Sequence, residues 1–201
     1  MRNPVLAGER VYLRPFEPAD GDMFAEIDAI EDDLHIDDGP RSGFSTMATR
    51  KWVERFTGDA LPGRIQFAVC LKENDYCIGL VGLGDLDWVH RTASTFALFR
   101  PGEYRGRGYG TESKHLVMEF AFEHLGLHSL VSWIWERNER SIAAILKQGY
   151  RPAGRLKHEA MNQGRYYDVC LFDLLREDWE SARATWQASR ARPQPESSGG
   201  T

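Results

Sequence analysis

A glycine- and arginine-rich hexamer near the middle of the chain carries the residues best suited to chemistry. It reads Arg105-Gly106-Arg107-Gly108-Tyr109-Gly110, and Thr111 and a long helical pattern follow it. The first amides of a helix have no intrahelical acceptor, and that end carries about half a positive charge. Glycines let such amides approach an anion, and guanidinium groups match phosphate oxygens. The segment therefore predicts a phosphate site at the start of a helix.

Two common phosphate-binding loops do not fit this spacing. A P-loop requires Gly-Lys-Ser/Thr, whereas Gly110 is followed by Thr111 and Glu112. A dinucleotide fingerprint requires glycines spaced by two and then three residues, whereas these lie at 106, 108 and 110. The chain also lacks a βαβ start near its N-terminus. A surface turn without a ligand is the plain alternative that stays open.

Strand and helix patterns surround the hexamer. Residues 92–99 (TASTFALF) are predicted to form a strand whose apolar residues run almost unbroken toward its end, as in a strand covered on both faces. Residues 111–125 form the clearest predicted helix, and Gly126 ends it. The hexamer is therefore expected at a turn from a strand into a helix, which is the geometry that an anion site requires.

The remaining segments predict one mixed sheet with helices. Their strand patterns are bounded by turn signals, and their helical patterns repeat apolar residues every three to four positions. The further predicted strands cover residues 9–15, 65–72, 76–86, 129–135, 151–161 and 166–174, and the further predicted helices begin at residue 18 and cover 46–57 and 139–148. Strands and helices that share one sheet indicate the α+β class.

Length and composition indicate one soluble domain. A chain of 201 residues with 42% hydrophobic and 27% charged residues is ordinary for a globular protein. We expect the domain to cover residues 1–180, and residues 181–201 to hold the end of a C-terminal helix and a disordered tail. The chain starts without the apolar segment of a signal peptide, and no apolar run reaches the roughly 18 residues of a membrane span. We therefore expect a cytoplasmic protein with no membrane partner.

Charge and cysteine content argue against two kinds of function. The net charge of −5 argues against a general nucleic-acid-binding protein, which carries a basic surplus. Acidic residues gather at 31–38 and basic ones at 100–114, which suits an anionic cofactor beside a cationic substrate; solvated faces are the equal alternative. Cys70, Cys77 and Cys170 match no zinc or disulfide spacing, so we expect no metal site.

The hexamer resembles the pyrophosphate-binding loop of the GNAT N-acetyltransferase family, whose pattern is Arg/Gln-x-x-Gly-x-Gly/Ala. The order of elements is similar to the family's over residues 9–179, and the segments 138–142 (NERSI) and 147–150 (KQGY) match around the second-last helix. The segments 11–15 (VYLRP) and 164–169 (GRYYDV) resemble the branch of ribosomal-protein-alanine and spermidine N-acetyltransferases.

The resemblance implies a fold and an acetyl-CoA site. The fold would be a mixed, mostly antiparallel sheet with one splayed pair of strands and helices on both faces. The pantetheine arm would lie between the strand that ends at Phe99 and its splayed partner. Backbone groups of Leu98, Phe99 and Arg100 would hydrogen-bond that arm. Residues 105–111 would hold the pyrophosphate, and Asn138 would lie beside the arm, cap the following helix, or do both.

The reaction that the resemblance implies is direct transfer of an acetyl group from acetyl-CoA to an amine. A backbone amide near Leu98 or Phe99 would stabilise the oxyanion. Many family members place a tyrosine as general acid where this chain has Ile145. Ser141, one turn after Asn138, is therefore the candidate to hydrogen-bond the thiolate, with an ordinary helix-start serine as the alternative.

Carboxylates are the candidates for the base. Alkyl amines have a pKa near roughly 10, so a base must remove the ammonium proton before attack. Glu159 lies on the second-last predicted strand, and Asp85 and Asp87 lie near the end of a central one. Each could equally be a solvated carboxylate. His90, a lone histidine in a predicted loop, is the weaker candidate.

The leading hypothesis is an N-acetyltransferase for a primary amine. Its acceptor would be a protein N-terminus, a polyamine or an aminoglycoside-like small amine, and the acidic stretch at 31–38 favours a cationic one. The sequence leaves open whether the protein forms a homodimer. The alternative is a non-catalytic acyl-CoA-binding module, which the absence of a tyrosine at 145 favours. A nucleotide-binding regulator is a third interpretation, and the missing P-loop lysine argues against it.

Overall fold

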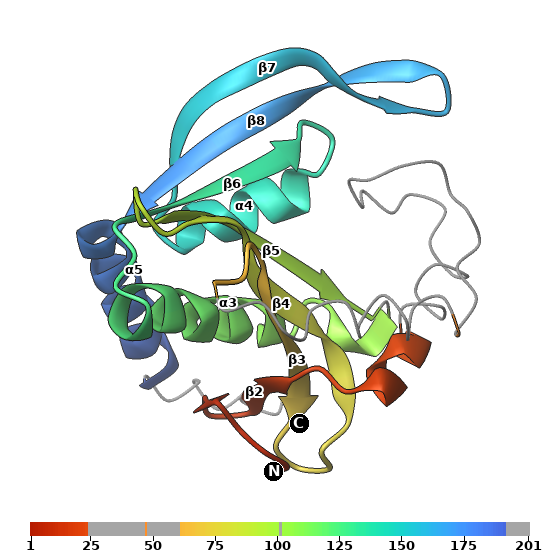
Figure 1. The fold of residues 1–201 in the computed structure, drawn as a ribbon, viewed down its shortest axis with the longest axis vertical. Helices are drawn as coiled ribbons and strands as arrows, with labels where there is room; N and C mark the ends of the chain where they lie inside the picture. Colours follow the sequence, from red (N-terminus) through yellow and green to blue (C-terminus); the bar gives the residue numbers. More distant parts are fainter. Residues whose placement is uncertain (24–46, 48–60, 101, 192–201) are drawn as a thin grey trace, which may run out of the picture.

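The computed structural model describes residues 1–23, 47, 61–100 and 102–191, which are built around one eight-stranded sheet (Figure 1). The strands lie in the order β1-β2-β3-β4-β5-β6-β8-β7. Every neighbouring pair runs antiparallel except β5 and β6, which run parallel. The strands are β1 (Leu6–Ala7), β2 (Val11–Pro15), β3 (Ile65–Leu71), β4 (Cys77–Asp87), β5 (Thr92–Phe99), β6 (Ser129–Trp135), β7 (Arg151–Asn162) and β8 (Arg165–Leu175).

The longest helical stretch follows the glycine-rich turn. α3 continues directly into a π-helical turn, η3, in which the amide of Leu125 reaches back to the carbonyl of Phe120 at 3.0 Å. Gly126, at φ 65°, then turns the chain out of the helix. The helical elements are η1 (Pro18–Asp20), η2 (Gly102–Tyr104), α3 (Tyr109–Glu119), η3 (Phe120–His124), α4 (Glu139–Lys147) and α5 (Arg176–Ala191).

The parallel strands β5 and β6 separate after a short contact. Their paired residues are Thr92–Ser94 on β5 and Ser129–Val131 on β6. Beyond Ser94, β5 stays paired with β4 and β6 stays paired with β8, so the two strands diverge toward their carboxyl ends (Figure 1). We call this opening the fork. The edge of β5 along the fork carries backbone groups that no neighbouring strand pairs, and such an edge can take up an extended ligand.

The main core lies between one face of the sheet and the α3–η3 rod. Val117, Met118, Ala121 and Phe122 are fully buried there, because their spacing places them on one side of the helix. α5 adds Trp179, which is fully buried and packs its ring 5.4 Å from that of Phe122. Smaller apolar clusters cover the opposite face of the sheet; they include Tyr12, Ala68, Cys70, Met23 and Leu80.

The predicted α+β sheet with one splayed strand pair is confirmed. The predicted strands 92–99 and 129–135 coincide with β5 and β6. α5 runs unbroken across residue 180, so the expected boundary between residues 180 and 181 falls inside a helix that packs on the core. The predicted helix over 46–57, most of the helix from residue 18 and the acidic stretch at 31–38 lie outside the described residues. None of the described helices is both long and apolar enough to cross a lipid bilayer.

Candidate active site

The hexamer forms an open turn at the start of α3, next to the carboxyl end of β5. Gly106 and Gly108 have φ of 75° and 82°, in the left-handed region that glycine adopts most readily. The first hydrogen bond of the helix runs from the amide of Glu112 to the carbonyl of Gly108, at 3.1 Å. The amides of residues 109–111 precede that bond, and no side chain caps the helix. The start of α3 thus offers donors to an anion.

The glycines of the turn differ in what they provide. A Cβ on Gly108 would lie 3.2 Å from Nη2 of Arg10, and a Cβ on Gly110 would lie 3.3 Å from Cε2 of Phe99. A Cβ on Gly106 would meet no atom within 4 Å. Glycine is therefore needed at 106 for the backbone conformation, at 110 for space, and at 108 for both.

Arg10 supports this turn from the side of β2, and sequence reasoning did not single it out. Its Nη1 donates to the carbonyl of Arg107 at 2.9 Å, its Nε lies 3.2 Å from the carboxylate of Glu112, and its guanidinium lies 4.7 Å from the centroid of the Tyr109 ring. Its Nη2 is buried and has no hydrogen-bond partner among the described residues. A buried donor without an acceptor is costly, so a ligand oxygen beside Gly108 would complete it.

The other arginines near the turn lie in different surroundings. Arg107 is exposed to solvent. Arg105 is half-buried and donates from Nη2 to the carbonyl of Phe99 at 3.0 Å, which ties the turn to the end of β5. Arg100 directs its Nε to the carbonyl of Cys77 at 3.0 Å, and its burial lowers the pKa of its guanidinium. Arg107 is the arginine of the hexamer most open to a ligand, whereas Arg105 shapes the turn.

The backbone groups that face the fork belong to alternate residues of β5. Arg100, just beyond the end of β5, donates its amide to the carbonyl of Ile78 on β4 at 2.9 Å. Adjacent residues of an antiparallel pair alternate in the edge that they face, so Leu98 also faces β4, whereas Ala97 and Phe99 face the fork. This corrects the prediction that Leu98 and Arg100 would hydrogen-bond an extended ligand, because the backbone groups of these two residues face β4. Of the three predicted residues, Phe99 is the one that turns its amide to the fork.

The start of α4 carries Asn138 and Ser141. Oδ1 of Asn138 accepts the amide of Ser141 at 3.1 Å, so the interpretation of Asn138 as a helix cap is confirmed. The hydroxyl of Ser141 makes no hydrogen bond with the described residues. Ile145, one turn further along, is buried in the main core. α4 therefore has no proton donor at the position where family members carry a tyrosine.

Asp85 lies beside the narrow end of the fork. It has φ of 48°, in a β-bulge of β4, and its exposed carboxylate accepts the hydroxyl of Ser94 at 2.8 Å. Ser94 is the last residue of β5 that pairs with β6, and its side chain shares a face of the sheet with that of its partner Val131. Trp133, two residues further along β6, lies on this same face and is 50% exposed. We call this side of the sheet the Asp85 face.

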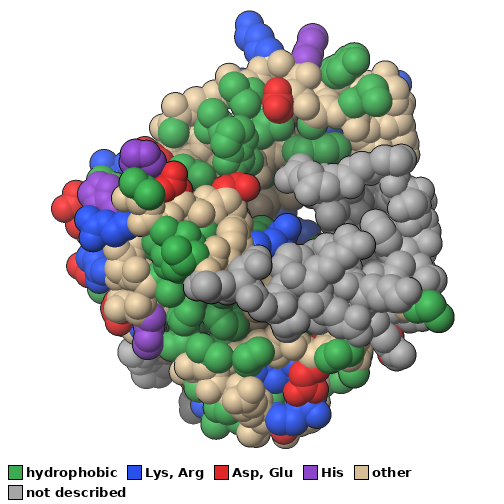
Figure 2. All heavy atoms as spheres, in the orientation of Figure 1, with side chains coloured by type: hydrophobic (Ala, Val, Ile, Leu, Met, Phe, Trp, Pro, Cys, Tyr) green, Lys and Arg blue, Asp and Glu red, His purple; other side chains and the backbone are tan. Residues whose placement is uncertain are grey.

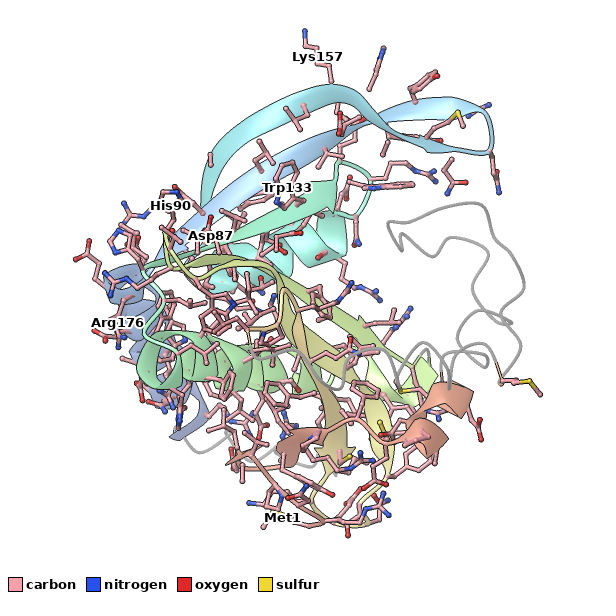
Figure 3. The ribbon with its side chains drawn as sticks, in the orientation of Figure 1. Met1, Asp87, His90, Trp133, Lys157 and Arg176 are labelled. Carbon is pink, nitrogen blue, oxygen red and sulfur yellow. The ribbon has the colours of Figure 1, made fainter. Side chains whose placement is uncertain are left out.

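Asp87 and Glu159 are not brought to the fork. The amides of His90 and Val89 donate to Asp87 at 2.7 and 2.9 Å; these bonds lower the pKa of Asp87 and use its carboxylate in the turn between β4 and β5. Figure 3 shows Asp87 and His90 at this turn, near the end where β5 and β6 are still paired. Glu159 is exposed on β7, and β8 separates that strand from β6. The role of Glu159 as a base stays a prediction, with β8 between its strand and β6.

The residues around the fork fit an acyl-coenzyme A. The uncapped amides of residues 109–111 and the unsatisfied nitrogen of Arg10 suit the oxygens of a diphosphate. The unpaired edge of β5 suits the amides of a pantetheine arm. Figure 2 shows a hollow between the β5 and β6 sides of the molecule, with basic side chains visible on its floor.

Comparison with known sequences agrees with this geometry. Residues 10–151 match the family model described as an acetyltransferase (GNAT) domain. YokL, an uncharacterized N-acetyltransferase derived from the SPbeta prophage of Bacillus subtilis (strain 168), is 28% identical over 178 residues, which are 86% of this chain and 94% of YokL. YdaF of the same organism, named provisionally as a ribosomal N-acetyltransferase, is 26% identical over 183 residues, 87% of this chain and 96% of YdaF.

Solved structures share the fold. A chimera of the spermidine N-acetyltransferase SpeG from Vibrio cholerae and hSSAT superposes with a TM-score of 0.74 at 21% identity, covering 86% of this chain and 99% of that one. A GNAT-family acetyltransferase from Bacillus anthracis superposes with a TM-score of 0.72 at 23% identity, covering 86% of this chain and 98% of that one.

Proposed function

Because the chain belongs to the GNAT acetyltransferase family and is an acetyl-CoA-dependent N-acetyltransferase, we propose that it moves the acetyl group directly onto a primary amine that enters from the Asp85 face. The observation that carries the proposal is the fork. Its wide end lies beside the uncapped amides of α3, and its narrow end lies beside an exposed carboxylate. Anionic acetyl-CoA, the acetyl donor, and a cationic amine, the acetyl acceptor, can therefore meet at one place in the sheet.

The residues proposed to hold acetyl-CoA are those whose hydrogen-bonding groups have no partner among the described residues. The amides of residues 109–111, with Arg107 and Nη2 of Arg10, would bind the diphosphate. The fork-facing backbone of Ala97 and the amide of Phe99 would pair with the pantetheine arm, since the carbonyl of Phe99 already accepts a hydrogen bond from Arg105. The amide of Phe99 points to where the thioester oxygen would lie, and a fixed donor there stabilises the negative charge that develops during attack.

Asp85 is the proposed base for the acceptor. Its carboxylate is exposed and held by the hydroxyl of Ser94, so it can take a proton from an approaching ammonium group and pass it to water. Trp133 on the same face offers an aromatic surface to the cation. Ser141 is the proposed hydrogen-bond donor to the sulfur of coenzyme A, since its hydroxyl makes no hydrogen bond with the described residues.

A primary amine is the acceptor chemistry that these groups share. The carboxylate of Asp85 attracts an ammonium group, and holding the amine against a fixed thioester accounts for much of the rate gain. The names of the similar proteins mention spermidine for SpeG and a ribosomal N-acetyltransferase activity for YdaF, and both suit an amine acceptor. The acceptor is accordingly a polyamine, an aminoglycoside-like compound or a protein N-terminus.

The test is release of free coenzyme A from acetyl-CoA in the presence of a panel of amines. The panel contains polyamines, aminoglycosides and peptides with free N-termini, each with saturating acetyl-CoA, and mass spectrometry confirms the acetylated product. We expect turnover with at least one class and none with the corresponding N-acetylated compounds, which lack the reactive nitrogen.

A non-catalytic acyl-CoA-binding module is the second candidate, and the buried Ile145 is the observation that favours it. The same experiment separates the two. Tight binding of acetyl-CoA in a calorimeter, together with no turnover on any amine of the panel, would support the module and contradict the enzyme.

A further inference from the structure

Three buried polar side chains form a chain at the narrow end of the fork, on the face that packs against α3. Nζ of Lys114 lies 2.6 Å from Oγ1 of Thr95, and this oxygen lies 2.6 Å from the hydroxyl of Tyr150. The three residues are 5%, 6% and 2% exposed. They come from α3, from β5 and from the residue before β7, so the tertiary fold alone brings them together.

The fold does not need this lysine for its stability. Burial lowers the pKa of Lys114 from 10.5 to about 7, and no charged neighbour in the described part of the chain offsets that change. A buried amine without a counter-ion costs folding free energy that an apolar side chain of similar length would not cost. Buried groups that titrate near neutral pH are typical of functional sites.

The other titratable groups around Lys114 keep one charge state near neutral pH or face away from it. The ring centroid of Tyr150 lies 5.8 Å from Nζ, and burial raises the pKa of its hydroxyl, so it stays protonated. Glu112, on the same helix, points to β2 and accepts the amides that begin that strand. His115 packs against Trp186 of α5. Of the three residues Lys114, Thr95 and Tyr150, Lys114 is therefore the one that changes charge near neutral pH.

Thr95 connects this cluster to the fork. Ser94 is the last residue of β5 that pairs with β6, so Thr95 is the first residue whose edge is open. Neighbouring side chains of a strand point to opposite faces, so Thr95 points to α3 while Ser94 points to Asp85. An acceptor that attacks from the Asp85 face would leave the coenzyme's sulfur nearer the face of Thr95.

We propose that Lys114, Thr95 and Tyr150 form a proton relay that protonates the departing coenzyme A thiolate. The inference rests on the proposed function, because it requires an acyl-CoA in the fork. The hydroxyl of Thr95 is the group that meets the sulfur, and Lys114 is a positioning residue that acts through it. The relay supplies the proton donor that α4 lacks at Ile145.

The hydrogen bonds orient the proton that is transferred. The oxygen of Thr95 accepts a hydrogen bond from the ammonium group of Lys114, and either hydroxyl can be the donor in its bond with Tyr150. The relay requires the arrangement in which Tyr150 is the donor, because both lone pairs of the Thr95 oxygen are then used and its own proton is available to a sulfur in the fork.

The step balances in atoms and electrons. The amine nitrogen bonds to the carbonyl carbon and the carbon–sulfur bond breaks, which leaves the electron pair on sulfur. Sulfur takes the proton of the Thr95 hydroxyl, Lys114 gives a proton to Thr95, and the neutral Lys114 regains one from water before the next turnover. The attacking nitrogen loses two protons in all, one from the ammonium group before attack and one after it has bonded to the carbonyl carbon, and both leave through Asp85 to water.

The first test is the pH profile of kcat for coenzyme A release, with an amine that the wild-type protein acetylates. The wild type should lose kcat as the pH rises past about 7, where Lys114 loses its proton. Lys114→Met and Thr95→Val should each lower kcat by about 100-fold and remove this decline. Thr95→Ser keeps the hydroxyl and should keep the decline. Lys147→Met, which replaces an exposed lysine at the end of α4, should match the wild type.

A second readout does not depend on turnover. The Nζ resonance of Lys114 in protein with 15N-labelled lysine is identified by its absence from Lys114→Met. It should shift when coenzyme A is added and shift less with desulfo-coenzyme A, because that compound lacks the sulfur. Equal shifts with the two compounds would overturn the relay.

The outcomes separate the relay from the proposed function. If the wild type neither binds acetyl-CoA nor acetylates any amine, the proposed function fails. If the wild type does both, and Lys114→Met and Thr95→Val lower kcat but keep the decline at high pH, these residues are structural and only the relay fails. Acetyl-CoA affinity and thermal denaturation of each variant show whether its fold is intact.

Discussion

Nη1 of Arg10 donates a hydrogen bond to the carbonyl oxygen of Arg107 at 2.9 Å, across 97 residues of sequence. The bond joins the residue just before β2 to the turn that opens α3. Glu112 strengthens the same junction, because its buried carboxylate accepts the amide of Arg10 at 2.7 Å and that of Val11 at 3.2 Å. The shape of the proposed diphosphate site therefore depends on a strand far from the glycine-rich hexamer in sequence.

Replacement of Arg10 by Gln should weaken acetyl-CoA binding about tenfold, because it removes a charged donor and the support of the Arg107 carbonyl. Isothermal titration calorimetry measures the change. Arg2→Gln is the matched control, since Arg2 is exposed and pairs with Glu17 at the chain's N-terminal end. Equal affinities for wild type and Arg10→Gln would show that Arg10 does not contribute to the site.

Gly108→Glu should abolish acetyl-CoA binding and leave the fold largely intact. It sets a carboxylate where a phosphate is expected, at a position whose φ is 82° and whose Cβ would approach Arg10. Gly164→Glu is the control for charge and backbone strain, because Gly164 has φ of 74° in the β7–β8 turn with open space around it. Binding by calorimetry should be lost in the first variant and kept in the second.

Asp85→Asn should lower kcat/KM for the acceptor amine by about 100-fold, because the amide cannot take up the ammonium proton. Glu159→Gln should stay close to the wild type, since β8 lies between its strand and β6. Steady-state kinetics of both variants at saturating acetyl-CoA decide the matter. A large loss for Glu159→Gln with none for Asp85→Asn would reverse the assignment.

Lys114→Met should stabilise the protein against unfolding at neutral pH. The pKa of Lys114 is lowered from 10.5 to about 7 in the folded state, so the unfolded chain binds more protons between these values. The free energy of unfolding of the wild type should therefore fall as the pH falls from about 10.5 through about 7, and that of Lys114→Met should fall less. Urea denaturation across this range measures the difference, which should vanish above about pH 10.5.

His115→Leu should reduce the acid sensitivity of the fold. Burial, with a smaller effect of Arg183, lowers the pKa of His115 from 6.5 to about 4, and neither ring nitrogen has a partner among the described residues. The unfolded state binds the proton first, so the wild type loses stability as the pH falls from about 6.5 through about 4. The variant should lack this part of the loss in thermal denaturation, and a Leu replacement of the exposed His128 should not change it.

Local patterns made much of the fold predictable. The strands at 92–99 and 129–135 and the helix after the hexamer could be identified because their apolar residues repeat with the period of one element and a glycine marks the stop. The turn proposed to bind phosphate could be located because its donors would be amides of consecutive residues. Such a site is built from one short segment and requires no residue that is distant in the sequence.

Features built from several elements could not be predicted. The roles of Arg10 and of the Lys114–Thr95–Tyr150 cluster depend on side chains that the sequence separates by up to 102 residues. The choice between Asp85 and Glu159 also had no sequence signal, because both are single carboxylates on strands. Only the order of the strands in the sheet decides which one lies beside the fork.

The sequence by itself determined the glycine-rich turn into a helix, the α+β class and the resemblance that led to acetyl-CoA. The tertiary structure decided which edge of β5 is open, which carboxylate stands beside it and which buried amine lies behind it. The physical reason is that backbone conformation is set by neighbours along the chain. Catalytic geometry depends on distances between elements, and only strand pairing and helix packing fix those distances.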